Sequence, residues 1–225
     1  MRLLSVFVGL LLLVGCGDPV PRGGEARIMA MGDSLMAWHA ASDRSIADVL
    51  ADRLGEPVVD RSVVGASYTY PLPISGSLGL RISAQYVPGD WDWVVLNGGG
   101  NDLWLGCGCL RCDAQLERLV SPDGTQGKIP ALVSQIRRSG ARVAYIGYLR
   151  TPGVTSPVEH CVKYGDALEA RLTAMAARDN GVVFLSNQDL VPNGDRSYHD
   201  VDRIHPSPKG SAAIAARVAA EIGAR

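Results

Sequence analysis

The stretch MAMGDSLMAW, residues 29–38, decides how the rest of the sequence is interpreted. Residues 28–31 are apolar and do not alternate with polar residues, which is typical of a strand buried on both faces. Gly32, Asp33 and Ser34 end this run with a turn. A serine at such a place either caps the following helix or presents its hydroxyl for chemistry, and this stretch alone does not decide which.

Four more apolar runs follow, and helical patterns lie between them. The strands expected are 28–31, 57–64, 93–97, 143–149 and 182–185. The helices expected are 42–54, 80–86, 128–139, 158–178 and 207–222. Alternation of strand and helix is typical of a parallel sheet with helices on both faces. We therefore expect an α/β fold, a three-layer α/β/α sandwich around a parallel sheet of about five strands.

Composition supports one such domain and excludes one class of function. The chain has 225 residues, 47% of them hydrophobic and 20% charged, which suits one globular domain with a sizeable core. The formal net charge is −1 and the basic residues are scattered, so we expect no nucleic-acid partner. No metal-ligand motif such as H-E-x-x-H is present, and we expect no metal, no cofactor and a monomer.

Polar or glycine-rich residues follow the first three expected strands. They are 32–34 (GDS), 65–67 (GAS) and 98–102 (GGGND). In parallel α/β sheets, ligands bind beyond the carboxyl ends of the strands. Asp202 and His205 lie in the loop DVDRIHPSPKG, residues 200–210, before the last expected helix. The chain therefore offers a nucleophile, a base, a group to orient the base and oxyanion donors, as a serine hydrolase requires.

Four blocks of sequence, in this order, resemble those of the SGNH, or GDSL, hydrolase superfamily. They are Gly32-Asp33-Ser34-Leu35, the isolated Gly65, Gly99-Gly100-Asn101-Asp102 and Asp202-Arg203-Ile204-His205-Pro206. The resemblance spans residue 28 to about residue 222 and implies a flavodoxin-like sheet.

The resemblance also implies a role for each residue of these blocks. Ser34 would attack the acyl carbonyl, His205 would accept its proton, and Asp202 would orient the imidazole. The backbone N–H groups of Ser34 and Gly65 and the side-chain amide of Asn101 would form the oxyanion hole.

The activity implied is that of a serine esterase acting on carboxylic esters or thioesters through an acyl-enzyme on Ser34. No long insertion that could form a lid is visible, so short-chain acyl groups, acetylated glycans and lysolipids are the expected substrates. Two alternatives remain: an acyltransferase that uses the same triad, and a non-catalytic surface lipoprotein that binds a glycan or another partner.

Other polar residues near the blocks have structural interpretations. Asp33 and Asp102 are expected to cap backbone N–H groups at their turns. His199 is the main rival base, whereas His39 and His160 are expected to have no catalytic role. Five aromatic residues lie near expected strand ends and either line a substrate pocket or pack in the ordinary way: Trp38, Tyr68, Tyr70, Trp104 and Tyr148.

Four cysteines are candidates for two disulfides. They are Cys107, Cys109, Cys112 and Cys161. Four thiols in an exported protein form disulfides more often than a metal site, although four thiolates could also hold zinc. Three pairings are possible, and the sequence does not choose among them.

The N-terminus indicates export. Arg2 precedes an apolar stretch, residues 3–14, that is too short for a membrane span, so residues 1–15 are expected to be a signal peptide. The end of this stretch, Leu13-Val14-Gly15-Cys16, resembles the lipobox of bacterial lipoproteins, in which the cysteine is lipidated. Residues 16–25 would then be a lipidated tether, and residues 26–225 the hydrolase domain. The protein is expected on the periplasmic or outer-membrane face of a bacterial membrane; an uncleaved anchor or a plain secretory signal is the alternative.

Overall fold

The computed structural model of the protein describes residues 26–151 and 156–223. The expected signal peptide, the tether and Cys16 lie outside these residues. Within them, no helix is long and apolar enough to cross a bilayer.

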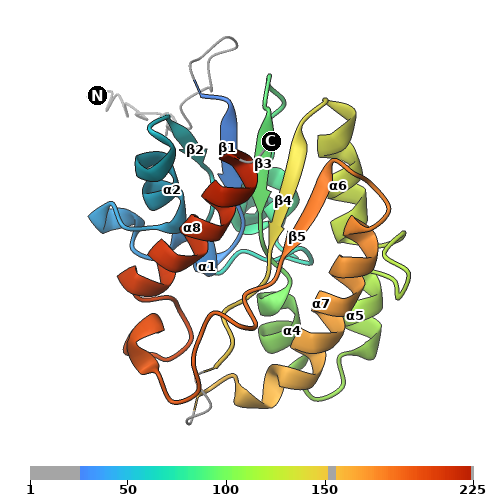
Figure 1. Ribbon diagram of the computed structural model, residues 1–225. Coiled ribbons are helices and arrows are strands. Elements are labelled where there is room, and N and C mark those ends of the chain that lie inside the picture. The colour runs from blue at the N-terminus through green and yellow to red at the C-terminus, as the bar shows by residue number, and fades with distance from the viewer. Residues whose placement is uncertain (1–25, 152–155, 224–225) are drawn as a thin grey trace, which may run out of the picture.

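Five parallel strands form one sheet, in the order β2-β1-β3-β4-β5 (Figure 1). This is the flavodoxin-like order, and the predicted fold class is confirmed. The strands are β1 (Ile28–Met31), β2 (Val58–Asp60), β3 (Trp93–Leu96), β4 (Arg142–Ile146) and β5 (Val182–Leu185).

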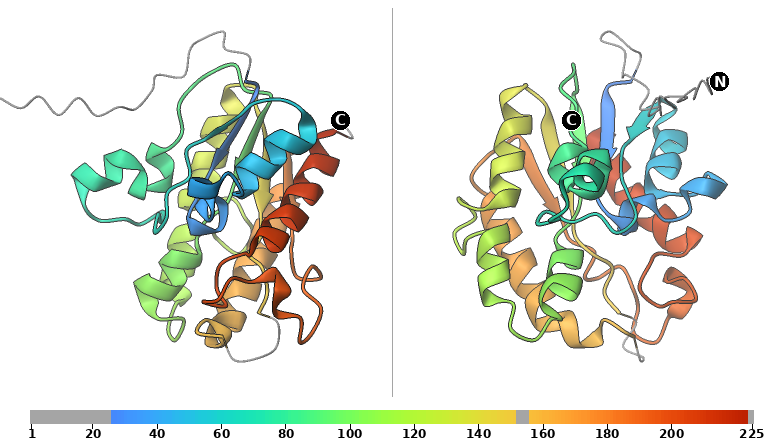
Figure 2. Two further views of the ribbon diagram at one scale, coloured as in Figure 1. Left: turned by 90° about the vertical axis from the view of Figure 1, so that its left-hand side faces the viewer. Right: turned by 180° about the vertical axis from the view of Figure 1, so that it is seen from behind.

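Helices cover both faces of the sheet (Figures 1 and 2). The short helix α1 (Ser34–Ala37), α2 (Ile46–Leu54) and α8 (Pro208–Gly223) lie on one side. On the other side lie α4 (Gly100–Cys107), α5 (Asp113–Leu119), α6 (Lys128–Arg138) and α7 (Val162–Ala176). A further short helix, α3 (Pro73–Ser75), follows β2.

Each central strand contributes side chains to two hydrophobic layers. In β1, Met29 and Met31 pack toward the helices α4 to α7, whereas Ile28 and Ala30 pack toward α2 and α8. All four side chains are fully buried. This two-sided burial explains why the strands appear in the sequence as continuous apolar runs.

Several expected elements are shorter in the structure, and three helices, α3, α4 and α5, were not expected. The expected strand 143–149 ends at Ile146, and the expected helices 42–54 and 158–178 begin at Ile46 and Val162. The expected strand 57–64 ends at Asp60, whose carboxylate accepts the Ser62 N–H at 2.8 Å and so turns the chain away from the ladder. The expected helix 80–86 is only a 3₁₀ turn, Ile82–Ala84. The helices α4 and α5 were missed because glycines and cysteines, which are weak helix signals, surround them.

Candidate active site

Hydrogen bonds tie together the turns that follow β1, β2 and β3. The Val63 N–H donates to the carbonyl oxygen of Gly32 at 3.1 Å. The side-chain amide of Asn101 donates to the carbonyl oxygen of Ala66 at 2.9 Å. Gly65 therefore lies between Val63, which is bonded to the turn after β1, and Ala66, which is bonded to the turn after β3. The three strand ends meet at one edge of the sheet.

Gly32 allows the sharp turn that presents Ser34. Its φ is +152°, and a Cβ at this position would lie 2.2 Å from Oδ1 of Asn97. The same Oδ1 accepts the Asp33 N–H at 3.0 Å, which fixes the turn against the end of β3. Ser34 then begins α1 directly at the sheet edge.

One chain of hydrogen bonds runs from Ser34 to Asp202. Oγ of Ser34 lies 2.8 Å from Nε2 of His205, although the two residues are 171 positions apart in the sequence. Nδ1 of the same ring lies 2.5 Å from Oδ2 of Asp202. This pairing fits the neutral tautomer in which Nδ1–H donates to Asp202 and Nε2 accepts from the serine hydroxyl.

The surroundings of Asp202 keep its carboxylate charged. Burial opposes ionisation, but hydrogen bonds from the His205 ring and from two backbone N–H groups hold the pKa of Asp202 below its ordinary value. Those N–H groups belong to Ile204, at 2.9 Å, and to His205 itself, at 3.0 Å. A charged Asp202 orients the imidazole and stabilises its protonated form.

The indole ring of Trp38 covers one face of the His205 ring. The two rings are stacked, with centroids 3.7 Å apart and planes 8° from parallel. Nε1 of Trp38 donates to Oδ2 of Asp200 at 2.8 Å. The Asp200 N–H donates to the carbonyl oxygen of His205 at 2.8 Å, so Asp200 holds both the indole and the backbone of the histidine.

Three N–H groups are the expected oxyanion donors: the backbone N–H groups of Ser34 and Gly65 and the side-chain amide of Asn101. Within the described part of the chain, the backbone N–H groups of Ser34 and Gly65 donate no hydrogen bond to the protein. Gly65 has a φ of +80°, and a Cβ there would meet no atom within 4 Å. Nδ2 of Asn101 carries two hydrogens, of which the bond to Ala66 uses one. Ser34 and Asn101 line the cavity described below, whereas Gly65 does not.

Asp33 and Asp102, the acidic residues of the first and third blocks, are buried and have structural roles. Oδ1 of Asp33 caps α1 by accepting the Leu35 N–H, and Oδ2 accepts the hydroxyl of Tyr148. Asp102 caps no helix; its carboxylate accepts the N–H groups of Tyr68 and Thr69, at 2.9 and 2.8 Å, and so fixes the loop after Gly65. Burial raises the pKa of both carboxyls.

The other histidines do not reach Ser34. The ring of His199 is buried, and burial lowers its pKa. Nε2 of His39 lies 3.4 Å from Oδ2 of Asp200. His160 adjoins the disulfide-bonded Cys161. The rival base His199 is therefore not part of the hydrogen-bonded chain.

A cavity of about 500 Å³ opens beside Ser34 and His205. Two of the five aromatic residues named from the sequence, Trp104 and Tyr148, line it. Tyr68 is buried in the core, and the hydroxyl of Tyr70 pairs with Ser75. The aliphatic and indole side chains that line it are Leu35, Leu103, Trp104, Leu149, Val158, Val162, Leu168 and Ile204.

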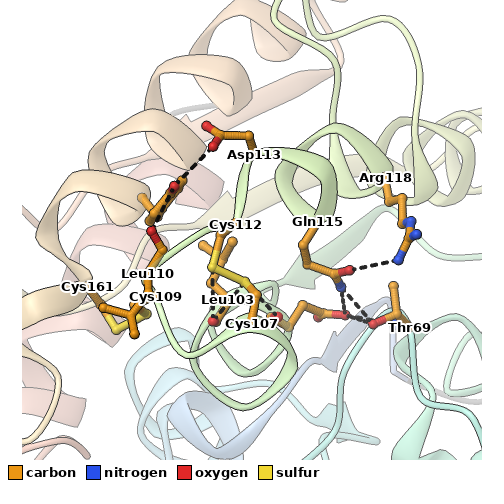
Figure 3. The surroundings of a disulfide bond; sticks show 12 residues. Thr69, Leu103, Cys107, Cys109, Leu110, Cys112, Asp113, Gln115, Arg118 and Cys161 are labelled. Atoms are coloured by element: carbon orange, nitrogen blue, oxygen red, sulfur yellow. Dashed lines mark hydrogen bonds between the residues drawn. A yellow bond between two sulfur atoms is a disulfide. The ribbon is translucent and has the colours of Figure 1, made fainter.

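The four cysteines form two disulfides, Cys107–Cys112 and Cys109–Cys161 (Figure 3). A thiolate zinc site is therefore not what these residues form in the structure. The ligand atoms of Cys109, His160 and Cys161 lie within 4.8 Å of one another, but both sulfurs are in the bridge and are not thiolates.

Sequence reasoning missed Asp200 and the cavity wall on α7. Asp200 lies 162 positions from Trp38, and no motif links the two residues. The α7 wall consists of Val162, Gly165, Asp166 and Leu168. The expected helix 158–178 covered these residues, but the side of the helix that faces the site depends on packing that the sequence does not reveal.

Solved structures share this architecture. A GDSL-like lipase from Bacteroides thetaiotaomicron matches over 91% of this chain and 91% of its own, with a TM-score of 0.63 and 18% identity. A carbohydrate esterase family 2 enzyme from Corynascus thermopiles, which also has a carbohydrate binding domain, matches over 92% of this chain and 68% of its own. Its TM-score is 0.61 at 17% identity. At such identities the likeness shows a common fold, and no curated protein sequence matches significantly.

Family membership follows from the sequence itself. The model of the GDSL-like lipase/acylhydrolase family matches residues 30–213, a range that includes Ser34, Gly65, Asn101, Asp202 and His205. The chain therefore belongs to the GDSL-like lipase/acylhydrolase family.

Proposed function

We propose that the protein is a serine esterase that forms an acyl-enzyme on Ser34. The observation that carries this proposal is the hydrogen-bonded chain from Ser34 through His205 to Asp202 beside an apolar cavity. A nucleophile, a base and a group that orients the base at these distances satisfy the geometric requirements of acyl transfer.

The reaction would proceed in two steps. Oγ of Ser34 attacks the ester carbonyl while Nε2 of His205 takes its proton, and the charged Asp202 stabilises the imidazolium. The N–H groups of Ser34, Gly65 and Asn101 stabilise the oxyanion. His205 then returns the proton to the leaving alcohol or thiol, and water releases the acyl group by the reverse sequence.

Among the expected substrates, the cavity favours an ester with an acyl chain of several carbons, as in a lysolipid, over an acetyl ester. A volume of 500 Å³ has room for roughly 16 non-hydrogen atoms at about 30 Å³ each, the share of a water molecule in the liquid. Each methylene buried against the apolar lining contributes about 0.8 kcal/mol, a factor of about four in kcat/KM.

Labelling and turnover test this function together. The full chain is treated with a fluorophosphonate, and the adduct is located by mass spectrometry; we expect it on Ser34. Ser34→Ala and His205→Ala should abolish the label, whereas Ser134→Ala, on the exposed face of α6, should retain it. Asn101→Ala should lower kcat by roughly 100-fold or more. A folded protein that takes no label and hydrolyses no aryl ester of any chain length would overturn the proposal.

We also propose that Cys16 attaches the protein to a membrane. The lipobox-like sequence supports this, and the tether would enter β1 at Ile28, at the sheet edge opposite Ser34. Mass analysis of the mature N-terminal peptide should find acyl chains on Cys16, and Cys16→Ser should release the protein from the membrane fraction. An unmodified Cys16 in the mature protein would contradict the proposal.

A further inference from the structure

One disulfide forms part of the cavity wall. Cys109 and Cys161 both line the cavity, whereas Cys107 and Cys112, which form the neighbouring bridge, do not. Figure 3 shows the two bridges close together, with Cys161 entering from a different segment. Nothing in the proposed chemistry at Ser34 requires a sulfur at this place.

The bridge connects the two helices between which the cavity lies. Cys109 follows α4, whose residues Gly100, Asn101, Leu103 and Trp104 line the cavity. Cys161 immediately precedes α7, which lines the same cavity with Val162, Gly165, Asp166 and Leu168. A covalent bond thus joins the turn that follows α4, the helix that carries Asn101, to the start of the helix on the opposite wall.

The backbone at Cys109 is held in an unfavourable conformation. Its φ is +56°, a left-handed value that costs free energy for any residue with a Cβ. Cys109 is buried, with only 4% of its surface exposed, and its N–H donates to the carbonyl oxygen of Leu103 at 3.0 Å. This conformation places the residue in the hydrophobic core that includes Leu103 and Leu168.

The other contacts that hold the start of α7 against the α4–α5 segment are weaker. The hydroxyl of Tyr164 lies 3.4 Å from the carbonyl oxygen of Leu110 and 3.2 Å from Oδ2 of Asp113. Both distances are long for a hydroxyl donor. Further along α7, Arg171 donates to the carbonyl oxygen of Val120 at 2.6 Å and to Glu117 at 2.9 Å, which holds the middle of the helix against α5. Without the bridge, only the long Tyr164 bonds and apolar packing would hold the start of α7 beside α4.

We propose that the Cys109–Cys161 disulfide is a specificity determinant: by fixing the distance between α4 and α7, it sets how many acyl carbons the cavity binds. This proposal rests on the ester hydrolase function proposed above. A short acyl group reaches only the residues next to Ser34, so its binding does not depend on the bridge. A longer chain packs between the two helices, and its contacts depend on their separation.

Two double variants of the full chain test this proposal. Cys109→Ala/Cys161→Ala removes the bridge in the wall, and Cys107→Ala/Cys112→Ala removes its neighbour as the matched control. We compare kcat/KM for p-nitrophenyl octanoate and butyrate, normalised to the fraction labelled at Ser34 by fluorophosphonate. Removing the wall bridge should lower the octanoate-to-butyrate ratio by about tenfold or more, because losing the burial of two methylenes corresponds to about 16-fold. The control should keep the ratio within about twofold of wild type.

The bridge closes a separation of 52 residues, so its removal could prevent folding. For that case, the bridge is reduced with a phosphine in folded Cys107→Ala/Cys112→Ala, in which Cys109 and Cys161 are the only cysteines left among the described residues. Mass analysis confirms the free thiols, and the same fall in the ratio is expected. An unchanged ratio after loss of the bridge, or an equal fall for both esters, would overturn the proposal. A wild-type protein that hydrolyses neither ester and takes no label would instead show that the proposed function is wrong.

Discussion

Trp38 gives His205 an aromatic face on which to carry a positive charge. In the proposed acyl transfer the imidazole becomes an imidazolium, and the negative face of an aromatic ring attracts a cation. The stacked geometry, 3.7 Å between centroids, places the indole where this attraction acts on the charged ring. The neutral ground state gains less from the same contact, so the stacking favours the transition state.

We expect Trp38→Leu to lower kcat for ester hydrolysis by about 2- to 30-fold, the equivalent of 0.5 to 2 kcal/mol of cation–π stabilisation. Trp38→Phe keeps an aromatic face but loses the bond to Asp200, so its loss should be smaller than that of Trp38→Leu. Steady-state kinetics on one aryl ester give both values, and thermal unfolding checks the fold. Equal losses in the two variants would argue against a role for the aromatic face.

The sequence predicted the candidate catalytic residues better than the residues that hold them in position. Ser34, Asp202 and His205 belong to blocks recognisable by motif, and the structure brings them into one hydrogen-bonded chain. The pairing of Trp38 with Asp200 could not be predicted, because only the folded loop brings the two residues together. The sequence likewise left the cysteine pairing open among three arrangements.

At the level of elements, the strands were predicted more closely than the helices. The first and last strands were predicted with the bounds that the structure shows, 28–31 and 182–185. Burial on both faces requires continuous apolar runs, which are visible in the sequence. The start of α4 at Gly100 follows Gly99, whose φ of +100° suits a glycine turn, and glycine gives no helix signal.

The turn after β1 should tolerate no side chain at Gly32. Ala at this position would place its Cβ 2.2 Å from Oδ1 of Asn97, at a φ of +152°. Gly32→Ala should therefore lower the free energy of unfolding by about 3 kcal/mol or more, through backbone strain and overpacking together. Urea denaturation followed by tryptophan fluorescence measures the change.

Gly55→Ala is the matched control for that prediction. Gly55 also has a positive φ, +67°, but a Cβ there would meet nothing within 4 Å. Its substitution carries the backbone cost alone, about 1 to 2 kcal/mol. If Gly32→Ala cost no more than Gly55→Ala, the contact with Asn97 would not be what requires the glycine.

In the whole molecule, the candidate site takes residues from both helical layers. Ser34 begins α1 and His205 precedes α8, on one side of the sheet, whereas α4 and α7, which also line the cavity, lie on the other side (Figure 1). The strand order places β1 and β3 side by side, at the point where the chain changes sides. A site at this switch point can combine Ser34 and Leu35 from one layer with Asn101 and Leu103 from the other.

At the scale of the whole molecule, the contribution of Asp33 and Asp102 to stability should fall as the pH rises above about 4, because these buried carboxyls keep their protons to a higher pH in the folded state than in the unfolded state. Burial raises the pKa of Asp33 and Asp102 above the ordinary value of 3.8. The stabilisation that these carboxyls contribute is fully present below pH 3.8 and is lost as the pH rises through each raised value. Each unit by which the pKa in the folded state exceeds that in the unfolded state corresponds to about 1.4 kcal/mol of the free energy of unfolding.

The buried His199 contributes a pH dependence of the opposite sign. Burial lowers its pKa in the folded state, so the free energy of unfolding rises as the pH rises toward 6.5. The difference between wild type and Asp33→Asn isolates the carboxyl from this background. Urea denaturation of both proteins at pH 4, 5, 6 and 7 should give a steeper fall with pH for wild type. Parallel curves would show that Asp33 ionises at the same pH in the folded and unfolded chains, and that its burial costs the protein nothing in this range.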